Sequence, residues 1–497
     1  MHSGLAVNLV RAAGFGIVSL AATCAHAGEV DPPAPFGACP TPAQVAWHEL
    51  EFYGFIHFTT NTFTDKEWGY GDESPAIFNP SQLEPAQWAR VAKDAGMRGL
   101  ILTAKHHDGF CLWPTKLTPH SVASSPYKGG QGDVVGEFAD AARAEGLKVG
   151  LYLSPWDRNH ADYGKPEYID YYRGQWSELI SSYGPLFEVW FDGANGGDGY
   201  YGGAREARRI ERSSYYRWEE TNQFIEQLNP GVIIFSDAGP GCRWVGNESG
   251  FSDETSWQTI NLAGMYPGVS HDHLARGDKN GTHWVGVEVD VSIRPGWFWH
   301  EHENDKVKTP EQLVEIYYQS VGRGANLLLN VPPDRRGLIH ENDIASLQGM
   351  RRILDNTFKN NLLADAKASS EEVRGRDAAT YGPQQAIDAD RKTYWATDDA
   401  ERTASMTVEL PASSTIDVLR LREAIELGQR VEEFSVDFWS EGEWKPLAGG
   451  ATIGPCRLLR FDPVTTTKLR LRITRAMAAP LISEFSAFKR PSPGVIR

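Results

Sequence analysis

The sequence predicts an α/β protein, in which a closed (β/α)₈ barrel of the TIM type is followed by an all-β sandwich. Between about residues 51 and 352, short apolar runs alternate with amphipathic helical patterns. After residue 361 the helical patterns stop, and β-rich runs separated by Pro, Gly and Asp replace them. Near-continuously apolar strands that alternate with helices favour a parallel sheet. A first region of about 300 residues fits a closed barrel. We therefore expect a catalytic barrel over 28–360 and a sandwich over 361–497.

Seven apolar runs in the first region are typical of buried strands, with helical patterns between them. The predicted strands are 52–58, 99–104, 148–154, 186–191, 232–236, 285–293 and 325–331. The predicted helices are 85–96, 133–145, 167–182, 216–228 and 309–321. The last of these has the clearest start, because Thr309 can cap it and Pro310 suits its first turn. Between 237 and 308 no helical pattern is legible, so one or two barrel units lack a predicted helix.

The second region carries the short alternating runs of a β-sandwich of about 130 residues. The predicted strands are 405–409, 417–421, 433–439, 457–461 and 468–474. The boundary with the barrel is expected near 358–365.

The N-terminus has the pattern of a secretory signal peptide. Arg11 precedes an apolar stretch over 12–22, and Ala25-His26-Ala27 is an Ala-x-Ala cleavage signal. We therefore expect residues 1–27 to be removed and the protein to be exported, to the periplasm or outside the cell. The apolar stretch is too short to span a bilayer. Cys24 offers a lipoprotein alternative, although Thr23 before it fits that signal poorly.

Charge and cysteine content exclude several classes of protein. A net charge of -16 argues against nucleic acid or an anionic membrane as the main partner. Cys39, Cys111, Cys242 and Cys456 follow the predicted signal peptide, and their spacings match no zinc pattern. Four cysteines are too few for a disulfide scaffold in a chain of this length. The chain is rich in aromatic rings, with 16 tryptophans, 18 tyrosines and 21 phenylalanines. Such rings suit stacking on sugars and equally suit the core of a barrel.

The carboxyl ends of the predicted strands carry the groups that could perform chemistry, since active sites of such barrels lie there. Nearly every strand end offers a His, a carboxylate or a Trp: His57, Glu67, Trp68, His106, His107, Asp108, Tyr152, Trp156, Asp157, Trp190, Asp192, Asp237, Arg243, Glu248, Arg294, Trp297, Trp299 and the cluster 300–303. So many polar groups are costly in an apolar cavity unless a ligand uses them. Imidazoles and carboxylates can bind hydroxyl groups while Trp faces pack on C–H surfaces, a combination that suits a sugar.

Each of these groups also has a structural interpretation. Asp192 before a glycine and Asp108-Gly109 are ordinary turn chemistry. Adjacent strand residues face opposite ways, so at most one of His106 and His107 points into the barrel unless the strand has already ended. The 300–303 cluster resembles a solvated loop. A metal site from His106, His107 and Asp108 lacks an HxH pair and a bridging lysine, so no catalytic metal is expected.

Five motifs together resemble glycoside hydrolase family 29, the retaining α-L-fucosidases. They are GFIHFTTNTF, KHHDGFCLWPT, VWFDGANGG, RWVGNE and NLLLNVPPDRRG, which occur in this order between about residues 50 and 360. The resemblance implies that Asp192, at the end of the fourth strand, is the catalytic nucleophile. It also implies a fucose-binding pocket made of His57, Glu67, Trp68, His106, His107, Tyr152 and Trp190.

The acid/base catalyst rests on a narrower resemblance. DAGPGCRWVGNESG is similar to the subfamily that cleaves α-1,3 and α-1,4 fucosides, in which the Glu after Trp-Val-Gly-Asn has this role. That residue is Glu248, and we expect Arg243 to bind at the site and help place it. Because 200–215 adds extra residues between the two carboxylates, the motif and not the spacing carries the assignment. Glu301 and Glu303 are the alternatives.

The C-terminal region resembles the discoidin-like, galactose-binding-like sandwich of many carbohydrate-binding modules. The motif that carries this resemblance is AIDADRKTYWAT at 386–397. In such modules an Asp-rich turn can hold a structural calcium ion, which makes Asp388 and Asp390 candidate ligands. Such domains also often serve only to pack against the barrel.

The sequence therefore predicts an exported enzyme that hydrolyses terminal α-1,3/1,4-linked L-fucose from glycans by double displacement, with no required cofactor. Two alternatives stay open. One is a secreted, lectin-like carbohydrate-binding protein with an inactive barrel, against which the two candidate carboxylates argue. The other is a glycosidase for a different sugar, because only the resemblance points to fucose. The expected partner is a fucosylated oligosaccharide or glycoconjugate.

Overall fold

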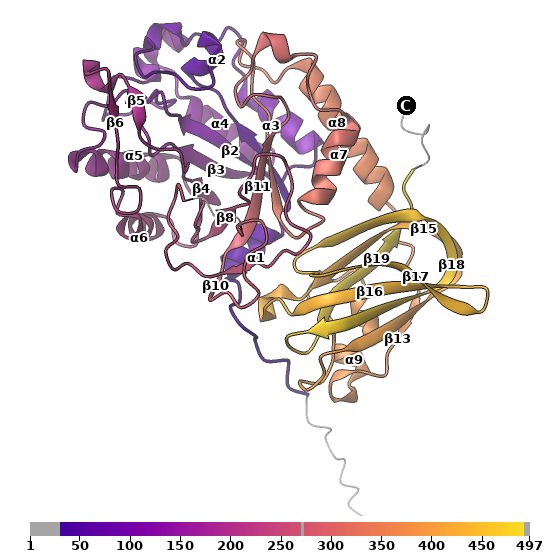
Figure 1. Ribbon diagram of the computed structural model, residues 1–497. Helices are drawn as coiled ribbons and strands as arrows, with labels where there is room; N and C mark the ends of the chain where they lie inside the picture. Colours follow the sequence, from indigo (N-terminus) through magenta and orange to yellow (C-terminus); the bar gives the residue numbers. More distant parts are fainter. Residues whose placement is uncertain (1–29, 270–272, 492–497) are drawn as a thin grey trace, which may run out of the picture. The chain divides into compact units, whose positions relative to one another are not determined.

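The computed structural model describes residues 30–269 and 273–491, and within them eight parallel strands form a closed barrel (Figure 1). Around the barrel the order is β1-β12-β11-β8-β7-β4-β3-β2, and each neighbouring pair within this order is parallel. The barrel strands are β1 (Phe52–Ile56), β2 (Gly99–Lys105), β3 (Lys148–Leu153), β4 (Glu188–Trp190), β7 (Ile233–Ser236), β8 (Cys242–Trp244), β11 (Gly286–Ser292) and β12 (Asn326–Asn330). The predicted barrel is confirmed.

The barrel strands are buried on both faces, which is why their sequences are almost continuously apolar. The residues of β1, β2, β11 and β12 are all buried. Large side chains, among them Tyr53, Phe55, Tyr152, Trp190 and Phe235, form one cluster of the core that packs inside the barrel. The opposite faces of the strands contribute to a second, larger cluster that includes apolar residues of the surrounding helices.

The helices of the barrel region are α1 (Pro42–His48), α2 (Thr60–Thr64), α3 (Pro85–Asp94), α4 (Val134–Ala144), α5 (Glu167–Tyr183), α6 (Trp218–Leu228), α7 (Pro310–Gln319) and α8 (Glu341–Phe358). The five predicted helices correspond to α3–α7. The start of α7 is a capping box, since Thr309 and Gln312 each accept from the other's backbone N–H. Helices α1, α2 and α8 were not predicted. Gly349 of α8 packs against Pro310, at a spot where a Cβ would lie 2.4 Å from the proline ring, so this glycine marks a helix contact.

The region 237–308 departs from a regular (β/α)₈ pattern, and here the sequence missed strand β8. Strand β7 leads into β8 through a turn of residues 237–241, too short for a helix. Between β8 and β11 the described residues form loops and the antiparallel pair β9 (Thr259–Ile260) and β10 (His283–Trp284), with no helix. Cys242–Trp244 has no apolar run of its own, and pairing with β7 and β11 defines it as a strand.

The residues at 200–215 belong to a structure on the rim of the barrel. Strands β5 (Gly197–Gly199) and β6 (Glu206–Arg208) form an antiparallel pair. The turn between them contacts the loop after β1, because the Tyr200 N–H donates to the Tyr70 carbonyl at 3.0 Å. Arg205 also pairs with Asp72 at 2.8 Å. The loop after strand β4 is therefore supported by the loop after β1.

The C-terminal region is an antiparallel β-domain, as expected for the predicted sandwich. Its strands are β13 (Lys367–Ser369), β14 (Trp395–Ala396), β15 (Ala404–Glu423), β16 (Val431–Ser440), β17 (Glu443–Gly450), β18 (Arg457–Ala476) and β19 (Leu481–Phe488), with the short helix α9 (Ala378–Tyr381). Strands β13, β14, β17 and β19 were not predicted. The predicted strands 405–409 and 417–421 are both parts of β15, and 457–461 and 468–474 are both parts of β18. The long strands β15 and β18 shift register between Glu409 and Ser414, and again between Ile416 and Val418. Such irregularities bend a strand and let it continue.

The β-domain is attached to the barrel by buried polar contacts. The Arg422 guanidinium of β15 lies 2.6 Å from the carboxylate of Glu51, which directly precedes β1. The Gln258 N–H donates to the Gln429 side chain at 2.9 Å. Glu51 is at the amino end of β1, so this contact is at the opposite end of the strand from the predicted chemistry.

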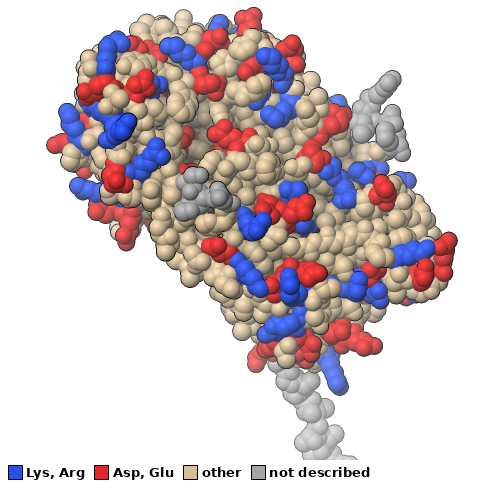
Figure 2. Space-filling view, viewed as in Figure 1, with Lys and Arg blue, Asp and Glu red and all other residues tan. Residues whose placement is uncertain are grey.

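The described surface has no single charge character on the face that Figure 2 shows, where acidic and basic side chains intermingle. Cys39, Cys111, Cys242 and Cys456 are all unpaired. Within the described ranges, no helix combines the length and apolar character that a membrane crossing requires. The predicted signal peptide, 1–27, and Cys24 lie outside the described residues.

Candidate active site

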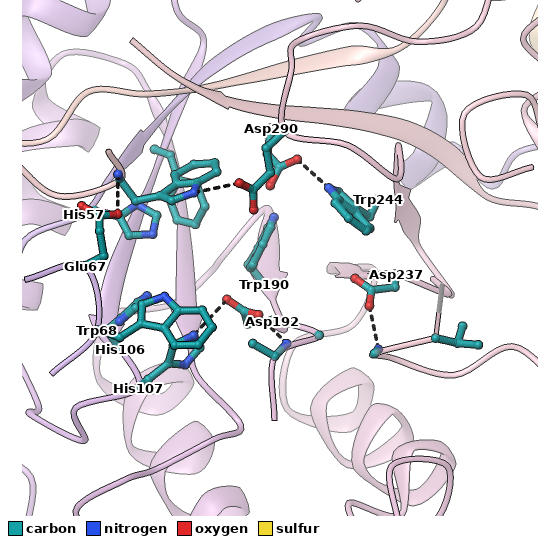
Figure 3. A pocket seen from close by; sticks show the side chains of 17 residues that line it. His57, Glu67, Trp68, His106, His107, Trp190, Asp192, Asp237, Trp244 and Asp290 are labelled. Atoms are coloured by element: carbon teal, nitrogen blue, oxygen red, sulfur yellow. Dashed lines mark hydrogen bonds and ion pairs between the residues drawn. The ribbon is translucent and has the colours of Figure 1, made fainter. Parts of the chain in front are cut away.

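A cavity of about 470 Å³ opens at the carboxyl ends of the barrel strands (Figure 3). Eight of the residues predicted for the site line it: His57, Glu67, Trp68, His106, His107, Trp190, Asp192 and Glu248. Two further strand-end candidates, Asp237 and Trp297, also line the cavity. The remaining lining residues were not among the candidates from the sequence, namely Phe55, Gly193, Ala194, Trp244, Gly268, Val269 and Asp290. The structure therefore brings together side chains from the loops and ends of most barrel strands.

Asp192 lies two residues after the end of β4 and points into the cavity. One of its oxygens accepts from the Tyr152 hydroxyl at 3.0 Å, and the other from the Ala194 N–H at 2.7 Å. Burial raises the pKa of Asp192 to about 6, although these two hydrogen bonds act in the opposite direction. Gly193 is required after it, since a Cβ there would lie 2.1 Å from an Asp237 oxygen. Tyr152 itself is fully buried and reaches the site through Asp192.

Both His106 and His107 contribute to the cavity, because β2 has already ended at Lys105. His107 Nδ1 lies 2.7 Å from the Ser154 hydroxyl, and that hydroxyl donates to the Trp156 carbonyl. His107 Nδ1 must therefore carry the hydrogen. Its Nε2 is left as an acceptor, 3.7 Å from Asp192.

The third imidazole, His57, has the same tautomer for a similar reason. Its Nδ1 lies 2.9 Å from Asn330 Oδ1, and the Asn330 amide nitrogen donates to Ser292 and to the Trp297 carbonyl, which fixes the orientation of that amide. Burial lowers the pKa of His57 and of His107 to about 3, and it places the pKa of His106 well below its ordinary value. The three imidazoles are therefore neutral at neutral pH, and the Nε2 atoms of His57 and His107 can accept hydrogen bonds from hydroxyl groups. His106 Nδ1 instead faces the Asn61 amide nitrogen at 3.4 Å, which leaves its Nε2 as a donor.

Glu248 lies on the exposed loop after β8 and reaches the cavity from its rim. Its Oε2 accepts from the Trp297 indole N–H at 3.2 Å. Partial burial, with the charges of Asp192 and Glu67, raises the pKa of Glu248. The pKa values of Asp192 and Glu248 are thus both raised, and the two carboxyl groups differ in their burial and in their hydrogen-bond partners.

Arg243 is not brought to the cavity. Its guanidinium is fully buried and donates to the backbone carbonyls of Leu274 and Trp257 at 2.9 Å and 2.8 Å, and to that of Val285. It therefore ties β8 to the loop that follows it instead of contacting a ligand in the cavity. Side chains on a strand alternate in direction, and Trp244, the next residue of β8, is the one that lines the cavity.

Two further carboxyl groups, Asp237 and Asp290, line the cavity. The Asp290 carboxylate accepts from the Trp244 indole at 2.8 Å, and Asp237 accepts from the Gly268 N–H at 2.6 Å. Burial raises the pKa of Asp237 to about 7 and that of Asp290 well above its ordinary range. The sequence did carry a signal for Asp290, since Glu288 and Asp290 alternate with valines in β11 and so share one face.

Beneath the cavity, Glu188 and Glu288 face each other inside the barrel. Trp190 donates to Glu288 at 2.8 Å and Trp47 donates to Glu188 at 2.9 Å, while the Tyr53 hydroxyl also donates to Glu288. Burial raises the pKa of both carboxyl groups. This network fixes the Trp190 ring, which stacks on Phe235 with centroids 4.0 Å apart and forms part of the cavity wall.

The other candidates for the acid/base catalyst do not line the cavity. Glu301 is exposed, and Glu303 is buried and accepts from the Gly296 N–H at 3.2 Å. Both belong to the short 3₁₀ helix η5 (Glu301–Glu303).

Three groups of possible metal ligands occur among the described residues: Asp65, His300 and His302; His106, His107 and Asp192; and Glu188, Cys242 and Glu288. In the first, both ring nitrogens of His300 face carboxylates, so no lone pair is free and the cluster is an ion-pair network. In the third, indole and phenol hydrogens occupy the carboxylates. In the second group His107 Nε2 is a free acceptor, and the three side chains are close enough to hold a divalent cation.

Comparison with known proteins gives consistent matches over nearly the whole chain. The sequence model of the family described as Alpha-L-fucosidase matches residues 35–357, and that of the F5/8 type C domain matches residues 365–485. The chain is 42% identical to "Alpha-L-fucosidase 1" of Arabidopsis thaliana, covering 94% of this chain and 91% of the plant protein. It is 43% identical to "Putative alpha-L-fucosidase 1" of Oryza sativa, covering 98% and 90%.

Solved structures show the same likeness. A putative alpha-L-fucosidase from Bacteroides thetaiotaomicron is 37% identical, with a TM-score of 0.84, and the match covers 93% of this chain and 100% of that one. A Ruminococcus gnavus GH29 fucosidase in complex with fucose is 31% identical, with a TM-score of 0.85, and the match covers 94% and 98%.

Proposed function

The chain belongs to the α-L-fucosidase family of glycoside hydrolases, and on that premise we propose that it removes terminal α-1,3/1,4-linked L-fucose from glycans with retention of configuration. The observation that carries this proposal is the pair of carboxyl groups in one cavity. Asp192 and Glu248 lie there beside three neutral imidazoles, and their environments differ. The structure of a relative in complex with fucose supports the choice of sugar.

In the proposed mechanism Asp192 is the nucleophile and Glu248 the acid/base catalyst. Ionised Asp192 attacks the anomeric carbon through an oxocarbenium-like transition state while Glu248 donates its proton to the departing glycosidic oxygen. Glu248, now a carboxylate, then takes a proton from the water that hydrolyses the fucosyl–enzyme. In such retaining enzymes the two carboxyl groups are roughly 5–5.5 Å apart. The Tyr152 hydroxyl and the Ala194 N–H hold the attacking carboxylate in place.

The sugar is expected to bind between the imidazoles and the Trp rings. The Nε2 atoms of His57 and His107 can accept from ring hydroxyls, with His106 and Glu67 beside them. Trp68 lies at the rim with 51% of its surface exposed, and its ring meets His107 edge-on at 5.2 Å. It is therefore available to cover a bound sugar.

The linkage preference is the finer part of the proposal and rests on DAGPGCRWVGNESG. We expect the protein to release fucose from trisaccharides with Fuc-α-1,3-GlcNAc and Fuc-α-1,4-GlcNAc, and at least about 100-fold more slowly from a Fuc-α-1,2-Gal substrate, a difference of about 3 kcal/mol between transition states. The measurement is kcat/KM for each by a fucose-release assay. Equal rates on all three linkages would contradict the linkage assignment but leave the fucosidase activity standing.

No metal is expected to take part in the reaction, while calcium is proposed as a stabiliser of the β-domain. Prolonged EDTA treatment should therefore leave fucose release unchanged at a temperature well below unfolding, because a two-carboxylate mechanism needs no Lewis acid. The same treatment should lower the melting temperature if Asp388 and Asp390 hold calcium. In the structure these residues shape a turn in which Asp388 accepts from the Thr393 hydroxyl at 2.8 Å. Loss of turnover that zinc or manganese restores would contradict the mechanism and point to His106, His107 and Asp192.

We also propose that the protein is exported, on the strength of the N-terminal pattern alone. Fractionation of the producing cells, with N-terminal sequencing of the protein, tests this. A mature chain that begins at Gly28 in the periplasm or medium is expected. A lipid-modified Cys24 at the start of the mature chain would replace this with the lipoprotein alternative.

A further inference from the structure

His300 lies between two carboxylates at the edge of the cavity, in a segment that the sequence suggested was a solvated loop. Its Nδ1 is 2.8 Å from Asp65 Oδ1, and its Nε2 is 2.6 Å from Glu67 Oε1. Only 6% of its surface is exposed. A carboxylate can only accept, so each ring nitrogen must carry a hydrogen to make both contacts. The geometry therefore requires an imidazolium, in contrast to the three neutral imidazoles inside the cavity.

The residue that His300 contacts through Nε2, Glu67, is part of the cavity wall, and one short segment holds it. The Trp297 N–H donates to Glu67 Oε2 at 2.8 Å, and the Phe298 N–H donates to Oε1 at 3.2 Å. This segment passes so close that a Cβ on Gly296 would lie 2.6 Å from Glu67 Oε1. Of the donors to Glu67 in this segment, the two backbone groups cannot titrate. His300 is the one that can change its charge.

The charged groups around His300 favour its protonated form. Burial lowers the pKa of His300, but the hydrogen bonds to Asp65 and Glu67 and the charges of Glu67 and Glu303 outweigh it, so the pKa is raised above its ordinary value. Reciprocally, the contact with His300 lowers the pKa of Asp65. Two further groups face the cluster: the His302 ring, 5.4 Å from that of His300, and Arg335, 3.7 Å from Asp65.

We propose that His300, as an imidazolium bridging Asp65 and Glu67, is a positioning residue that fixes the Glu67 carboxylate for sugar binding. Above the pH at which His300 loses its proton, one nitrogen becomes an acceptor facing a carboxylate, and Glu67 is no longer held on that side. Fucose binding then weakens as pH rises, whereas proton transfer by Glu248 belongs to a separate step. The inference rests on the proposed role of Glu67 in binding fucose.

The test is the dissociation constant of L-fucose, measured by titration calorimetry on the full chain between pH 5.5 and 9. Binding of the free sugar involves no bond cleavage, so the acid/base role of Glu248 does not enter. His300→Gln should bind fucose about tenfold more weakly at pH 6, which is the loss expected for one charged hydrogen bond. As the pH rises, the fucose affinity of this variant should fall less than that of the wild type, because the variant has no imidazolium at this position to lose its proton. His302→Gln is the matched control for affinity at pH 6, because His302 is exposed and does not contact Glu67, and it should bind fucose as tightly as the wild type at this pH.

A second variant keeps the test independent of whether His300→Gln folds. Asp65 caps α2 in the left-handed region with φ 60, which asparagine tolerates, and its side chain is 48% exposed. Asp65→Asn removes one of the two charges that favour the imidazolium, so the pH at which fucose binding weakens should move down by on the order of one unit. Asp192 and Asp237 titrate in the same profile, and therefore the difference between the variant and the wild type is the readout.

The outcomes separate the two proposals. Fucose affinity in His300→Gln equal to that of the wild type, or an Asp65→Asn profile that does not move, would overturn the role of His300. No detectable fucose binding by the wild type at any pH would instead overturn the proposed sugar site, whatever the variants do. Structural damage alone would weaken binding without moving the profile of Asp65→Asn.

Discussion

Asp192→Gly is expected to reduce fucose release by on the order of 10⁴-fold or more, because it removes the proposed nucleophile. Asp192 lies just after the end of β4, and hydrogen bonds from the Tyr152 hydroxyl and the Ala194 N–H orient its carboxylate. The measurement is kcat with an aryl fucoside. Asp198→Asn is a matched control, since Asp198 is an exposed carboxylate on the neighbouring β5 and the amide can keep its contact with Arg158. Near-native turnover by Asp192→Gly would show that the nucleophile lies elsewhere.

The ionisation of Asp192 also supplies a folding control. Its pKa rises from an unfolded value of 3.8 to about 6 in the folded protein. A carboxyl group whose pKa is higher in the folded state stabilises the folded protein at pH values below its unfolded-state pKa. This stabilisation is lost as the pH rises through the folded-state pKa. At pH 7.5 the ionised group therefore costs about 2 kcal/mol, after allowance for the 24% of the side chain that is exposed. Asp192→Asn should melt at or above the wild-type temperature at pH 7.5, and the gap should close toward pH 4. If the variant melts far below the wild type at pH 7.5, the ionised Asp192 carboxylate does not destabilise the folded protein as expected.

Glu248→Ala is expected to reduce cleavage of a natural fucosyl-α-1,3/1,4-GlcNAc linkage by about 10²–10⁴-fold, the usual contribution of general acid catalysis. An aryl fucoside with a good leaving group departs without a proton, so the first step should be affected much less. Added azide should then accelerate the second step and yield β-fucosyl azide, because a small anion needs no general base. Product analysis by mass spectrometry and NMR identifies the azide and its configuration.

Glu301→Ala and Glu303→Ala are the controls for Glu248. Neither side chain lines the cavity, and Glu301 is exposed. Neither variant should show azide rescue. If rescue occurs in one of them and not in Glu248→Ala, the acid/base catalyst lies in the 300–303 segment, and the link to the α-1,3/1,4 subfamily fails with it.

Features of the chain that depend on nearby residues could be predicted from the sequence. The seven predicted strands match barrel strands to within about two residues at each end, because a strand buried on both faces is apolar along its length. The start of α7 was predicted from Thr309 and Pro310, which also act within one turn of the chain. Strand β8 and helix α8 were missed, since the former is defined by its partners and the latter contains polar residues and a glycine at a helix contact.

The residues of the candidate site that lie at the ends of barrel strands could be predicted from the sequence. Asp192 and the histidines lie within two residues of the ends of barrel strands. The barrel therefore positions them independently of the conformation of the loops. Arg243 was wrongly expected at the site. It precedes the inward-facing Trp244, and because side chains alternate along β8, its guanidinium points to backbone carbonyls outside the cavity. A motif containing it could not reveal this, because the register of an unrecognised strand decides which side chain faces inward.

By itself the sequence determined the barrel, the sandwich and the reactive groups at the strand ends, because these follow from periodicity and turn chemistry within a few residues. Only the tertiary structure decided which loops meet. Glu67 and His300 are 233 positions apart, and Trp297 and Glu248 are 49 apart, yet each pair is in hydrogen-bond contact. Closure of the barrel brings these loops to one rim. The charge of His300 follows from that meeting, since a histidine in a solvated loop has no fixed partners, whereas one between two carboxylates must keep both of its protons.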